Sequence, residues 1–534
     1  MRFFNTAGPI VAEMHYHVPP LERLDLDEIL ALVEQAKYFV LHAPRQTGKT
    51  SCLLALMNRL NGSGAYRCLY VNVETGQAAR EDVGAAMRAV LSQLASRAEQ
   101  MLNDTFMQKM WSRTLESVGP HDAFREVLGR WAEASPEPLV LMIDEVDALI
   151  GDTLIALLRQ LRAGYDQRPR QFPQCVVLCG VRDVRDYRIR SSVENATVTG
   201  GSAFNIRTKS MRLGNFSEAE VRSLLAQHTE ETGQAWEESA LQTVWDLTQG
   251  QPWLVNALAY EACFDNKAGR DRRQPIDTEH IHQAREQLIL RRETHLDQLA
   301  HKLGEERVRR VIEPLLSSAP FAEVISNDDL QYVRDLGLVH TDPPIRIANP
   351  IYREAIPRDL TYTTQEGIPN EPAWYVDATG ALKMEDLLSA FQTFFREHSE
   401  HWVERFQYKE AGPQLLLQAF LQRIVNSGGR IEREYGLGRM RTDLLIVWPV
   451  SNASDAPKKG ETHQKVVIEC KLLRGSLEQT LALGLTQTRN YMDRCAAAEG
   501  HLVIFDRDPA KPWADKAFRR EEQVQGNSVT VWGM

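Results

Sequence analysis

Short apolar runs alternate with helix-like segments through the first 212 residues of the chain. Each run is almost wholly apolar, which is typical of a strand buried in a sheet. Strands that alternate with helices form parallel sheets with helices on both faces, so we expect an α/β fold. The four expected strands are Tyr38–His42, Cys68–Asn72, Leu139–Asp144 and Cys175–Gly180.

From Leu213 the pattern becomes helical. Ser217 is the expected N-cap of the first helix, and Glu220 is placed to complete a capping box. A second helix is expected over Glu238–Thr248, and the turn Gly250-Gln251-Pro252 then opens a third with proline near its start. These features predict a helical lid over residues 213–300.

Residues 301–360 change character again. Two helix-like segments, Glu306–Ser317 and Asp328–Leu336, precede two short strand-like stretches, Gly337–His340 and Ile345–Asn349. Helix, helix and small hairpin is the outline of a winged helix. Such a module binds DNA or packs against protein, and both interpretations stay open because they rest on the fold outline alone.

The C-terminal part predicts a second, smaller α/β domain. Residues 361–385 are rich in glycine, proline and threonine and form the expected linker. The domain itself is expected over residues 386–534, with a polar hairpin loop near residues 452–462. Its elements are a helix, three strands, a helix and a strand: Pro413–Asn426, Arg430–Tyr435, Thr442–Trp448, Gln464–Lys471, a helix with Gln487 and Tyr491, and His501–Phe505.

Composition is ordinary for a soluble protein of several domains. The chain has 534 residues, 43% hydrophobic and 25% charged, and no run approaches the ~18 apolar residues of a membrane span. No secretory signal is visible, and the seven cysteines form no C-x-x-C pair, so we expect a cytoplasmic protein without a membrane partner. Residues 396–534 carry 20 Lys+Arg against 18 Asp+Glu, whereas the rest carries 42 against 54, so a nucleic-acid contact is easier to place near the C-terminus.

The most specific motif is A-P-R-Q-T-G-K-T between the first expected strand and a helix over residues 51–60. Backbone N–H groups of such a loop hold phosphates, while Lys49 reaches the β- and γ-phosphates and the Thr50 hydroxyl binds Mg²⁺. Alanine stands where the first glycine is usual, which requires a negative φ there. The expected nucleotide-binding residues are Ala43, Arg45, Gln46, Thr47, Gly48, Lys49, Thr50 and Ser51.

A partner motif closes the third strand at Asp144-Glu145. Asp144 is placed to hold Mg²⁺ through water, and Glu145 to polarise the attacking water. The alternative is a core strand that ends in two solvated acids. Arg182, just beyond the fourth strand, is a candidate sensor of the γ-phosphate or else a surface arginine. Arg188, Arg190 and Arg207 are candidates for an arginine finger.

A second set of chemical residues lies on two strands of the C-terminal domain. Asp443 begins one strand, and Glu469 and Lys471 share one face of the next because side chains alternate along a strand. If these strands pair, Asp443 and Glu469 converge on one Mg²⁺ or Mn²⁺ ion, and Lys471 orients water or stabilises developing charge. Gln487, on one helix face with Tyr491, could line the same site. The alternative is a surface strand and a solvated helix face.

The motifs of residues 15–355 resemble those of AAA-like or STAND-type P-loop ATPases, including the archaeal-ATPase branch. The resemblance rests on Ala43–Thr50, Asp144-Glu145, Gly250-x-Pro252 and the winged-helix outline. It implies ATP and Mg²⁺ as cofactors. It also implies that the turn at Pro252 helps the winged helix to contact bound nucleotide.

Residues 413–505 resemble the PD-(D/E)XK nuclease superfamily, on Asp443, Glu469, Lys471 and Gln487-x-x-x-Tyr491. This resemblance implies Mg²⁺-dependent cleavage of DNA. Many members carry a glutamate on the first core helix, whereas this helix offers glutamines, and two acids of the first strand could compensate. The residues concerned are Gln414, Gln418, Gln422, Glu432 and Glu434.

Together the two resemblances predict an ATP-regulated, Mg²⁺-dependent endonuclease that acts on nucleic acid, with DNA as the expected substrate. The combination resembles bacterial ATPase–nuclease fusions of mobile elements or anti-phage defence. ATP binding is expected to order the chain or assemble several copies of it. One alternative is a nucleotide switch whose degenerate C-terminal domain only binds DNA or a protein partner. Another is a transcriptional regulator built on the winged helix.

Overall fold

The computed structural model describes residues 1–183, 188–191, 196–199, 205–316, 325–361, 375–377, 379–405, 411–425, 429–437, 440–450, 462–473, 475–508 and 510–534. It divides into two compact units. The first unit comprises Met1–His295 and Ser326–Asn349, and the second comprises Leu296–Ile325 and Pro350–Met534. The expected linker and the expected polar hairpin loop fall largely or wholly outside the described residues.

A five-stranded sheet forms the centre of the first unit; a parallel sheet was expected, but its fifth strand, β9, was not. Its strands lie in the order β4-β5-β6-β3-β9, and every neighbouring pair is parallel. The four predicted strands are present to within one residue, because strands buried on both faces are continuous apolar runs. The bounds are β3 (Tyr38–His42), β4 (Arg67–Asn72), β5 (Leu139–Asp144), β6 (Cys175–Gly180) and β9 (Arg207–Arg212).

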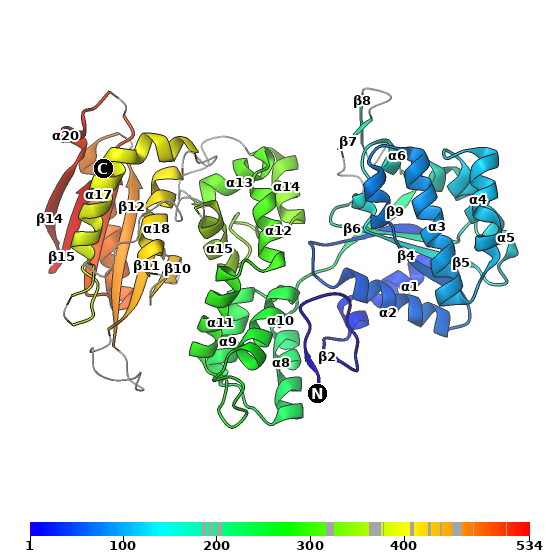
Figure 1. Ribbon diagram of the computed structural model, residues 1–534, viewed down its shortest axis with the longest axis horizontal. Helices are drawn as coiled ribbons and strands as arrows, with labels where there is room; N and C mark the ends of the chain where they lie inside the picture. The colour runs from blue at the N-terminus through cyan, green and yellow to red at the C-terminus, as the bar shows by residue number, and fades with distance from the viewer. Residues whose placement is uncertain are drawn as a thin grey trace. The chain divides into compact units, whose positions relative to one another are not determined.

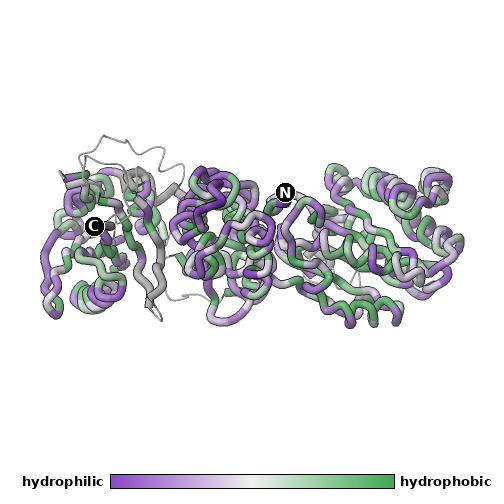
Figure 2. The backbone as a smooth tube through the Cα atoms, turned by 90° about the horizontal axis from the view of Figure 1, so that it is seen from below, coloured by the Kyte–Doolittle hydropathy of each residue, from purple (hydrophilic) through white to green (hydrophobic). Residues whose placement is uncertain are grey.

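Helices cover both faces of this sheet (Figure 1). Val40 and Leu141 point to one face, and Phe39 and Met142 to the other, so alternate residues of each strand feed two separate apolar clusters. In Figure 2, hydrophobic and hydrophilic stretches alternate along the helices of the chain. One face carries α1 (Leu26–Glu34) and α2 (Lys49–Gly62); the other carries α3 (Val83–Leu102), α4 (Phe106–Val118), α5 (Ala123–Ala134) and α6 (Asp152–Ala163).

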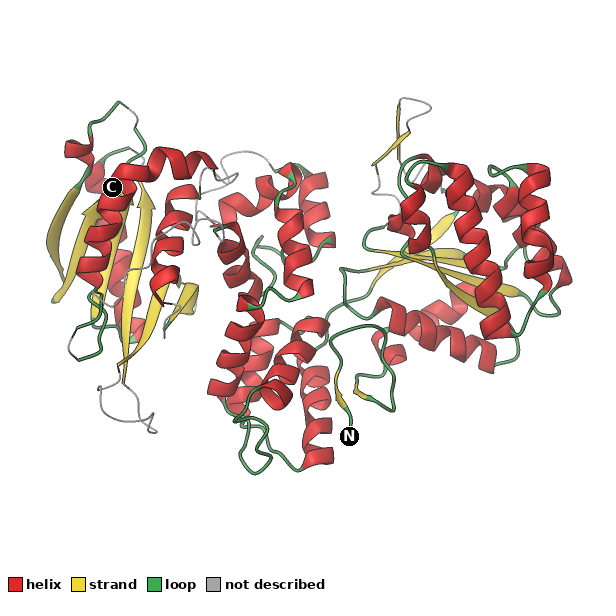
Figure 3. Cartoon of the chain, viewed as in Figure 1, coloured by secondary structure: helices red, strands yellow, loops and turns green. Residues whose placement is uncertain are grey.

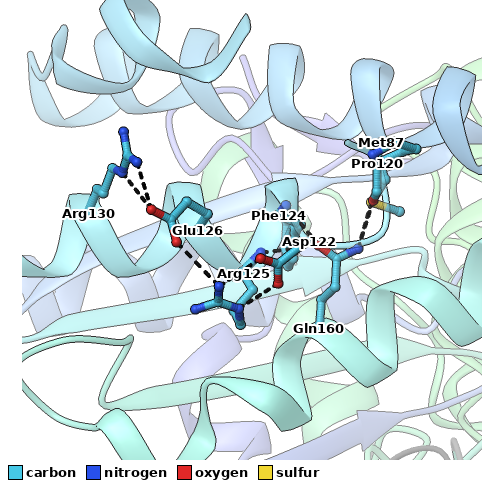
Figure 4. Close-up of polar contacts among 8 residues, drawn as sticks. All are labelled: Met87, Pro120, Asp122, Phe124, Arg125, Glu126, Arg130 and Gln160. Carbon is cyan, nitrogen blue, oxygen red and sulfur yellow. Dashed lines mark hydrogen bonds and ion pairs between the residues drawn. The ribbon is translucent and has the colours of Figure 1, made fainter. Parts of the chain in front are cut away.

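A buried glutamine fixes how two of these helices meet (Figure 4). Gln160 of α6 accepts hydrogen bonds at Oε1 from the backbone N–H groups of Phe124 and Arg125, at 2.8 and 3.2 Å. Its Nε2 donates to the carbonyl of Pro120 at 3.1 Å. These N–H groups belong to the first turn of α5, which has no intrahelical partner for them. Gln160 therefore acts as an N-cap supplied by a neighbouring helix.

The helices predicted to form the lid follow the sheet, and two of them start as predicted. Ser217 and Glu220 form the capping box, and α10 begins at Pro252. An N-terminal strap, residues 1–18, lies against the lid: Phe4 and Tyr16 of its paired strands contact the ring of His228. The elements are β1 (Phe3–Phe4), β2 (His15–Tyr16), α8 (Glu218–Thr232), α9 (Glu238–Thr248), α10 (Pro252–Tyr260) and α11 (Thr278–Leu290).

The elements expected of a winged helix are also present. Helix α14 (Asn327–Asp335) is followed by an antiparallel bridge between Val339 and Ile347. The segment Ser326–Asn349, called here the docked segment, belongs to the first unit, whereas α13 (Glu306–Leu316) and α15 (Pro350–Leu360) belong to the second. The predicted domain boundaries remain predictions.

The second unit contains a six-stranded sheet in the order β10-β11-β12-β13-β15-β14 (Figure 3). Strands β12, β13 and β15 are parallel, and the other neighbours are antiparallel. The predicted order of helix, three strands, helix and strand is present, and β14 with β15 adds a C-terminal hairpin that we did not predict. The strands are β10 (Arg430–Leu437), β11 (Met440–Val450), β12 (Thr462–Leu472), β13 (Glu499–Phe505), β14 (Phe518–Val524) and β15 (Asn527–Gly533).

Helices cover the two faces of this second sheet. Tyr491 and Met492 of α19 pack with Leu445 and Val467 on one face. Phe395 of α17 contacts Phe505 on the other, with ring centroids 5.3 Å apart. The helices are α17 (Met384–Arg405), α18 (Gly412–Val425), α19 (Leu477–Cys495) and α20 (Trp513–Lys516). No helix in the described part of the chain is both long enough and apolar enough to cross a bilayer.

Candidate nucleotide and metal sites

The loop between β3 and α2 has the backbone of a phosphate-binding loop. Gln46 and Gly48 have φ values of 57° and 91°, and α2 begins at Lys49. A Cβ at Gly48 would lie 2.7 Å from Nη1 at the end of the flexible Arg23 side chain, which could move, so the position requires glycine for its φ. Ala43 is absent from the described residues with positive φ, as its side chain requires. The loop therefore directs the N–H groups of the α2 N-terminus towards one point.

Side chains of this loop are held by short local contacts. Lys49 Nζ donates to the carbonyls of Ala43 and Pro44, both at 2.9 Å, and Thr47 Oγ1 donates to Pro44 O at 2.8 Å. Arg45 is exposed at the tip of the loop. Ser51 Oγ accepts a hydrogen bond from the N–H of Ile10 in the strap at 3.0 Å. The predicted residues thus lie together.

Asp144 is fully buried and connects the two predicted motifs. Thr50 Oγ1 donates to Asp144 Oδ2 at 2.8 Å, and Tyr70 Oη donates to the same oxygen at 2.9 Å. The N–H of Glu145 donates to Oδ1 at 2.9 Å. A carboxylate and a hydroxyl side by side are hard oxygen donors that suit Mg²⁺. Tyr70 was missed at the sequence level because it lies within an apolar strand.

Glu145 follows with an unusual backbone and a perturbed carboxyl. Its φ is 54°, which costs energy for a residue other than glycine and is common at functional sites. Burial, and secondly the charge of Asp147, raises its pKa above the ordinary value, although Lys49 opposes the shift. A carboxylate with a raised pKa is a stronger base, which suits a group that polarises water.

A cavity of about 830 Å³, called here the phosphate cavity, opens beside the loop. Lys49, Thr50 and Glu145 line one side of it. Gln93 and Arg97 of α3 line it as well, and no local pattern singled out either residue in the sequence. The cavity therefore joins the residues predicted to hold phosphate, metal and attacking water.

A smaller pocket of about 110 Å³, called here the lid pocket, lies between the strap, the loop and the lid. Pro252 and Trp253 line it, and Trp253 Nε1 donates to the carbonyl of Thr6 at 2.9 Å. Among the described residues, the buried Oη of Tyr16 and Oδ1 of Asn256 have no hydrogen-bond partner. Buried polar atoms normally have one. The pocket is therefore suited to a ligand with polar groups, such as the base or ribose of a nucleotide.

Arg182 lies just past β6, where it was predicted, and its side chain is buried against the docked segment. Its Nε is 3.2 Å from Asp335 Oδ2, with side chains 7% and 0% exposed, and its guanidinium lies 4.9 Å from the ring centroid of Tyr332. Burial raises the pKa of Asp335, although Arg182 opposes the shift. Contact between Arg182 and a γ-phosphate remains a prediction. The side chains of Arg188, Arg190 and Arg207 lie outside the described residues.

In the second unit, β11 and β12 bring the two predicted carboxylates together. The pairing of Leu444 with Ile468 puts Asp443 opposite Glu469. The N–H of Cys470 donates to Asp443 Oδ2 at 2.8 Å, and the N–H of Asp443 is 3.4 Å from Glu469 Oε2. Two carboxylates on one face of adjacent strands form a possible site for a divalent cation.

The carboxylates of this pair lie close to each other and to the ammonium group of Lys471, and Glu469 is buried. Glu469 is 3% exposed, and Lys471 Nζ donates to its Oε1 at 2.5 Å. Burial, and then the charge of Asp443, raises the pKa of Glu469 to about 8, against the opposing effect of Lys471. Burial disfavours the charge on Lys471, yet the two carboxylates outweigh it and raise its pKa. A cation that replaced the proton on Glu469 would relieve this repulsion.

Gln487 lies on the helix that covers the same face. Lys465 Nζ donates to the carbonyl of Cys495 at 3.1 Å, which aligns α19 with β12. Gln487 lies one helical turn before Tyr491, which packs with Val467 on this face of the sheet. Oε1 of Gln487 is buried and has no hydrogen-bond partner among the described residues. Its placement is therefore compatible with the predicted role.

A third acidic ligand is not found within the part of the chain that the structure describes. No group of three or more His, Cys, Asp or Glu side chains gathers there. The side chains of Glu432 and Glu434 lie outside the described residues. Helix α18 is buried throughout residues 412–422, and its polar side chains there are three glutamines: Gln414, Gln418 and Gln422.

Comparison with known proteins supports the assignment of the N-terminal part of the chain. Residues 17–272 match the family model described as AAA-like domain. This span contains the loop, Asp144, Glu145 and most of the lid. The N-terminal part of the chain is therefore an AAA-like P-loop ATPase domain. A search of curated proteins found no match.

Several solved structures resemble the chain in part. A Walker-type ATPase of Pyrococcus abyssi has a TM-score of 0.43 and 14% identity, covering 66% of this chain and 99% of that one. Cdc6p from Pyrobaculum aerophilum has a TM-score of 0.35 and 15% identity, covering 65% and 93%. The RuvB Holliday junction branch migration motor of Thermotoga maritima has a TM-score of 0.33 and 13% identity, covering 62% and 93%. No substrate or partner of this chain is inferred from these partial likenesses.

Proposed function

We propose that this chain is an ATP-regulated, metal-dependent nuclease with DNA as its substrate. The ATPase domain of the first unit would bind and hydrolyse ATP, and the second unit would cleave the phosphodiester backbone. The observation that carries the nuclease assignment is the pairing of Asp443 with the buried Glu469 on adjacent strands, with Lys471 in contact with Glu469.

In the ATPase domain, different residues bind the phosphates, the metal ion and the attacking water. Lys49 leaves its two carbonyl acceptors to bind the β- and γ-phosphates, and loop N–H groups hold the rest of the phosphate chain. Thr50 and Asp144 would hold Mg²⁺, which supplies charge that neutralises the phosphates. Glu145 orients the attacking water and accepts its proton. The lid pocket at Pro252 takes the base or ribose.

In the second unit the acidic pair would hold Mg²⁺ or Mn²⁺. A bound ion would supply positive charge next to the scissile phosphate and would make coordinated water more acidic. Glu469 must lose its proton to bind the ion, so metal binding and ionisation are coupled. Lys471 donates a hydrogen bond to the scissile phosphate or to the attacking water. Gln487 helps to position that water.

The switch between the two activities would use Arg182. Its guanidinium is the counter-ion of Asp335 in the docked segment, and it lies two residues beyond Gly180, whose carbonyl accepts from the N–H of Ala43 at 3.2 Å. A γ-phosphate at the loop would compete with Asp335 for Arg182. ATP binding would thereby loosen the docked segment and permit the chain to assemble with further copies.

The second candidate function is a nucleotide switch whose C-terminal domain binds DNA or a protein partner without cutting. The buried glutamines of α18 favour it, because many nucleases of the superfamily that this domain resembles carry a glutamate on this helix. A metal site with two carboxylates and no third acid binds its ion more weakly. The same experiment distinguishes the two candidates.

The test uses the purified full chain with plasmid DNA and single-stranded DNA, Mg²⁺ or Mn²⁺, and with or without ATP. We expect cleavage that Asp443→Ala abolishes while ATP binding stays unchanged, because the residue lies in the other unit. Asp515→Ala, an exposed carboxylate on α20, is the matched control and should cut like the wild type. Absence of cleavage and of metal binding under every condition would favour the second candidate. Light scattering with and without ATP tests the expected self-association.

A further inference from the structure

One wall of the phosphate cavity is formed by α3, a helix that contains none of the ATPase motifs. Gln93 and Arg97 are one turn apart on this helix and both line the cavity with Lys49 and Glu145. The guanidinium carbon of Arg97 lies 5.7 Å from the ring centroid of Tyr70. Tyr70 in turn donates to Asp144. Tyr70 therefore links Arg97 to Asp144, the residue predicted to hold Mg²⁺.

Among the described residues, Arg97 lacks a carboxylate partner of the kind that two other arginines of the same unit have. Arg67 pairs with Asp104 at 2.9 Å, and Arg125 pairs with Asp122 at 2.6 Å. Arg97 forms no ion pair with any carboxylate in the described part of the chain, and its guanidinium lies over the ring of Tyr70 instead. A half-buried guanidinium that faces a cavity without a counter-ion is suited to bind an anion there.

The charges that line the cavity lead to the same conclusion. Its ionisable lining residues are Lys49, Arg97, Glu74 and Glu145, besides the phenol of Tyr70, whose pKa is raised by burial and by Asp144. With all four charged, the lining is neutral; without Arg97 it would be negative. ATP bound with Mg²⁺ carries net negative charge, which a negative lining would repel.

We propose that Arg97 is a catalytic residue that contacts the phosphate chain of ATP bound to its own chain. The proposal rests on the ATPase assignment above. In hydrolysis the water oxygen bonds to Pγ as the bond from Pγ to the β,γ-bridging oxygen breaks. A proton passes from the water to Glu145, and ADP leaves with the electrons of the broken bond. Arg97 offsets the charge that builds on the phosphoryl oxygens, as an arginine finger does from a neighbouring protein.

The planar guanidinium matters to this role as much as its charge. Arginine can stack on Tyr70 with one face while its N–H groups point to phosphate oxygens. Lysine carries the charge but lacks the planar fork. We therefore expect Arg97→Lys to recover part of the activity lost in Arg97→Gln, a substitution that keeps most of the side-chain length without charge.

The experiment measures kcat, KM and nucleotide binding for Arg97→Gln and Arg97→Lys, with Arg88→Ala as matched control. Arg88 is exposed on the same helix. We expect kcat of Arg97→Gln to fall about 10²- to 10³-fold, the effect of removing one preorganised transition-state donor. ADP affinity should stay at the wild-type value, whereas affinity for ADP with aluminium fluoride, a mimic of the transferring phosphoryl group, should fall with kcat. Arg88→Ala should match the wild type.

Other outcomes overturn the proposal in distinguishable ways. A wild-type kcat in Arg97→Gln would show that Arg97 is not catalytic. An equal loss of ADP and ADP–aluminium fluoride binding, together with a lower melting temperature, would show that its role is structural. Recovery of activity when Lys49→Ala and Arg97→Gln chains are mixed would place the arginine on a neighbouring copy instead. Absence of ATP binding by the wild-type chain would contradict the ATPase assignment itself.

Discussion

Replacing Glu469 by glutamine should remove a pH dependence of stability from the second unit. The carboxyl is 3% exposed, and its pKa is raised from 4.5 to about 8 by burial and by Asp443. Below pH 4.5 the folded and unfolded chains both carry the proton. Between pH 4.5 and 8 the unfolded chain ionises while the folded chain keeps the proton, so stability falls as pH rises. Above pH 8 both are ionised and the fall ends.

The magnitude follows from the interval between the two pKa values. At about 1.4 kcal/mol per pH unit, the loss across this window is at most roughly 5 kcal/mol. Water that reaches the carboxylate on local opening reduces it, so a loss of ~2–3 kcal/mol is a realistic expectation. Lys471 does not oppose this trend, because its raised pKa affects stability only above its ordinary value of 10.5. In Glu469→Gln nothing titrates at this position and the loss should vanish.

Hydrogen exchange of the full-length chain measures this locally. Peptides from β12 are followed between pH 5.5 and 8.5 in EDTA, and opening free energies are corrected for intrinsic exchange rates. Glu521→Gln, an exposed glutamate on β14, should keep the wild-type slope. Added Mg²⁺ should restore stability at high pH in the wild type only, because it binds the ionised pair. Equal pH slopes in wild type and Glu469→Gln would refute the reasoning.

Three further predictions concern the first unit. Lys49→Ala should abolish ATP binding, since the phosphate loses its charge partner; unchanged affinity in calorimetry would contradict the site. Glu145→Gln should retain ATP but slow turnover by ~10²–10⁴-fold, the usual effect of losing a general base; wild-type turnover would place the water elsewhere. Asp335→Asn should loosen the docked segment, because losing one partner of a buried ion pair costs up to about 3–5 kcal/mol; unchanged hydrogen exchange of α14 would show that Arg182 does not hold it.

Local sequence patterns predicted the features that depend on residues close together in the chain. Fully buried parallel strands are continuous apolar runs, so Leu139–Asp144 and Cys175–Gly180 were predicted with the observed bounds. The capping box at Ser217 is a contact over three residues, which a sequence also shows directly. The phosphate-binding loop is likewise a run of consecutive residues, so its motif is visible in the sequence.

The residues that were missed reach their sites through packing between distant segments. Tyr70 looks like a core residue, and only the pairing of β4 with β5 brings its hydroxyl to Asp144. Arg97 is one polar position on an amphipathic helix. The partner of Arg182, Asp335, lies 153 residues further along the chain. The sequence therefore offered only a sensor or a surface arginine, and gave no sign of a buried ion pair. No periodicity encodes such contacts.

The ion pair of Arg182 gives the proposed switch a quantitative constraint. If Asp335 and a γ-phosphate compete for one guanidinium, ATP binding and docking of residues 326–349 are linked, and each must weaken the other by the same factor. ADP has no γ-phosphate and would not compete, so the two nucleotides should differ in their effect on the docked segment. Asp335→Asn should therefore raise affinity for ATP more than for ADP. An equal change for both nucleotides would mean that Arg182 holds the segment without sensing the γ-phosphate.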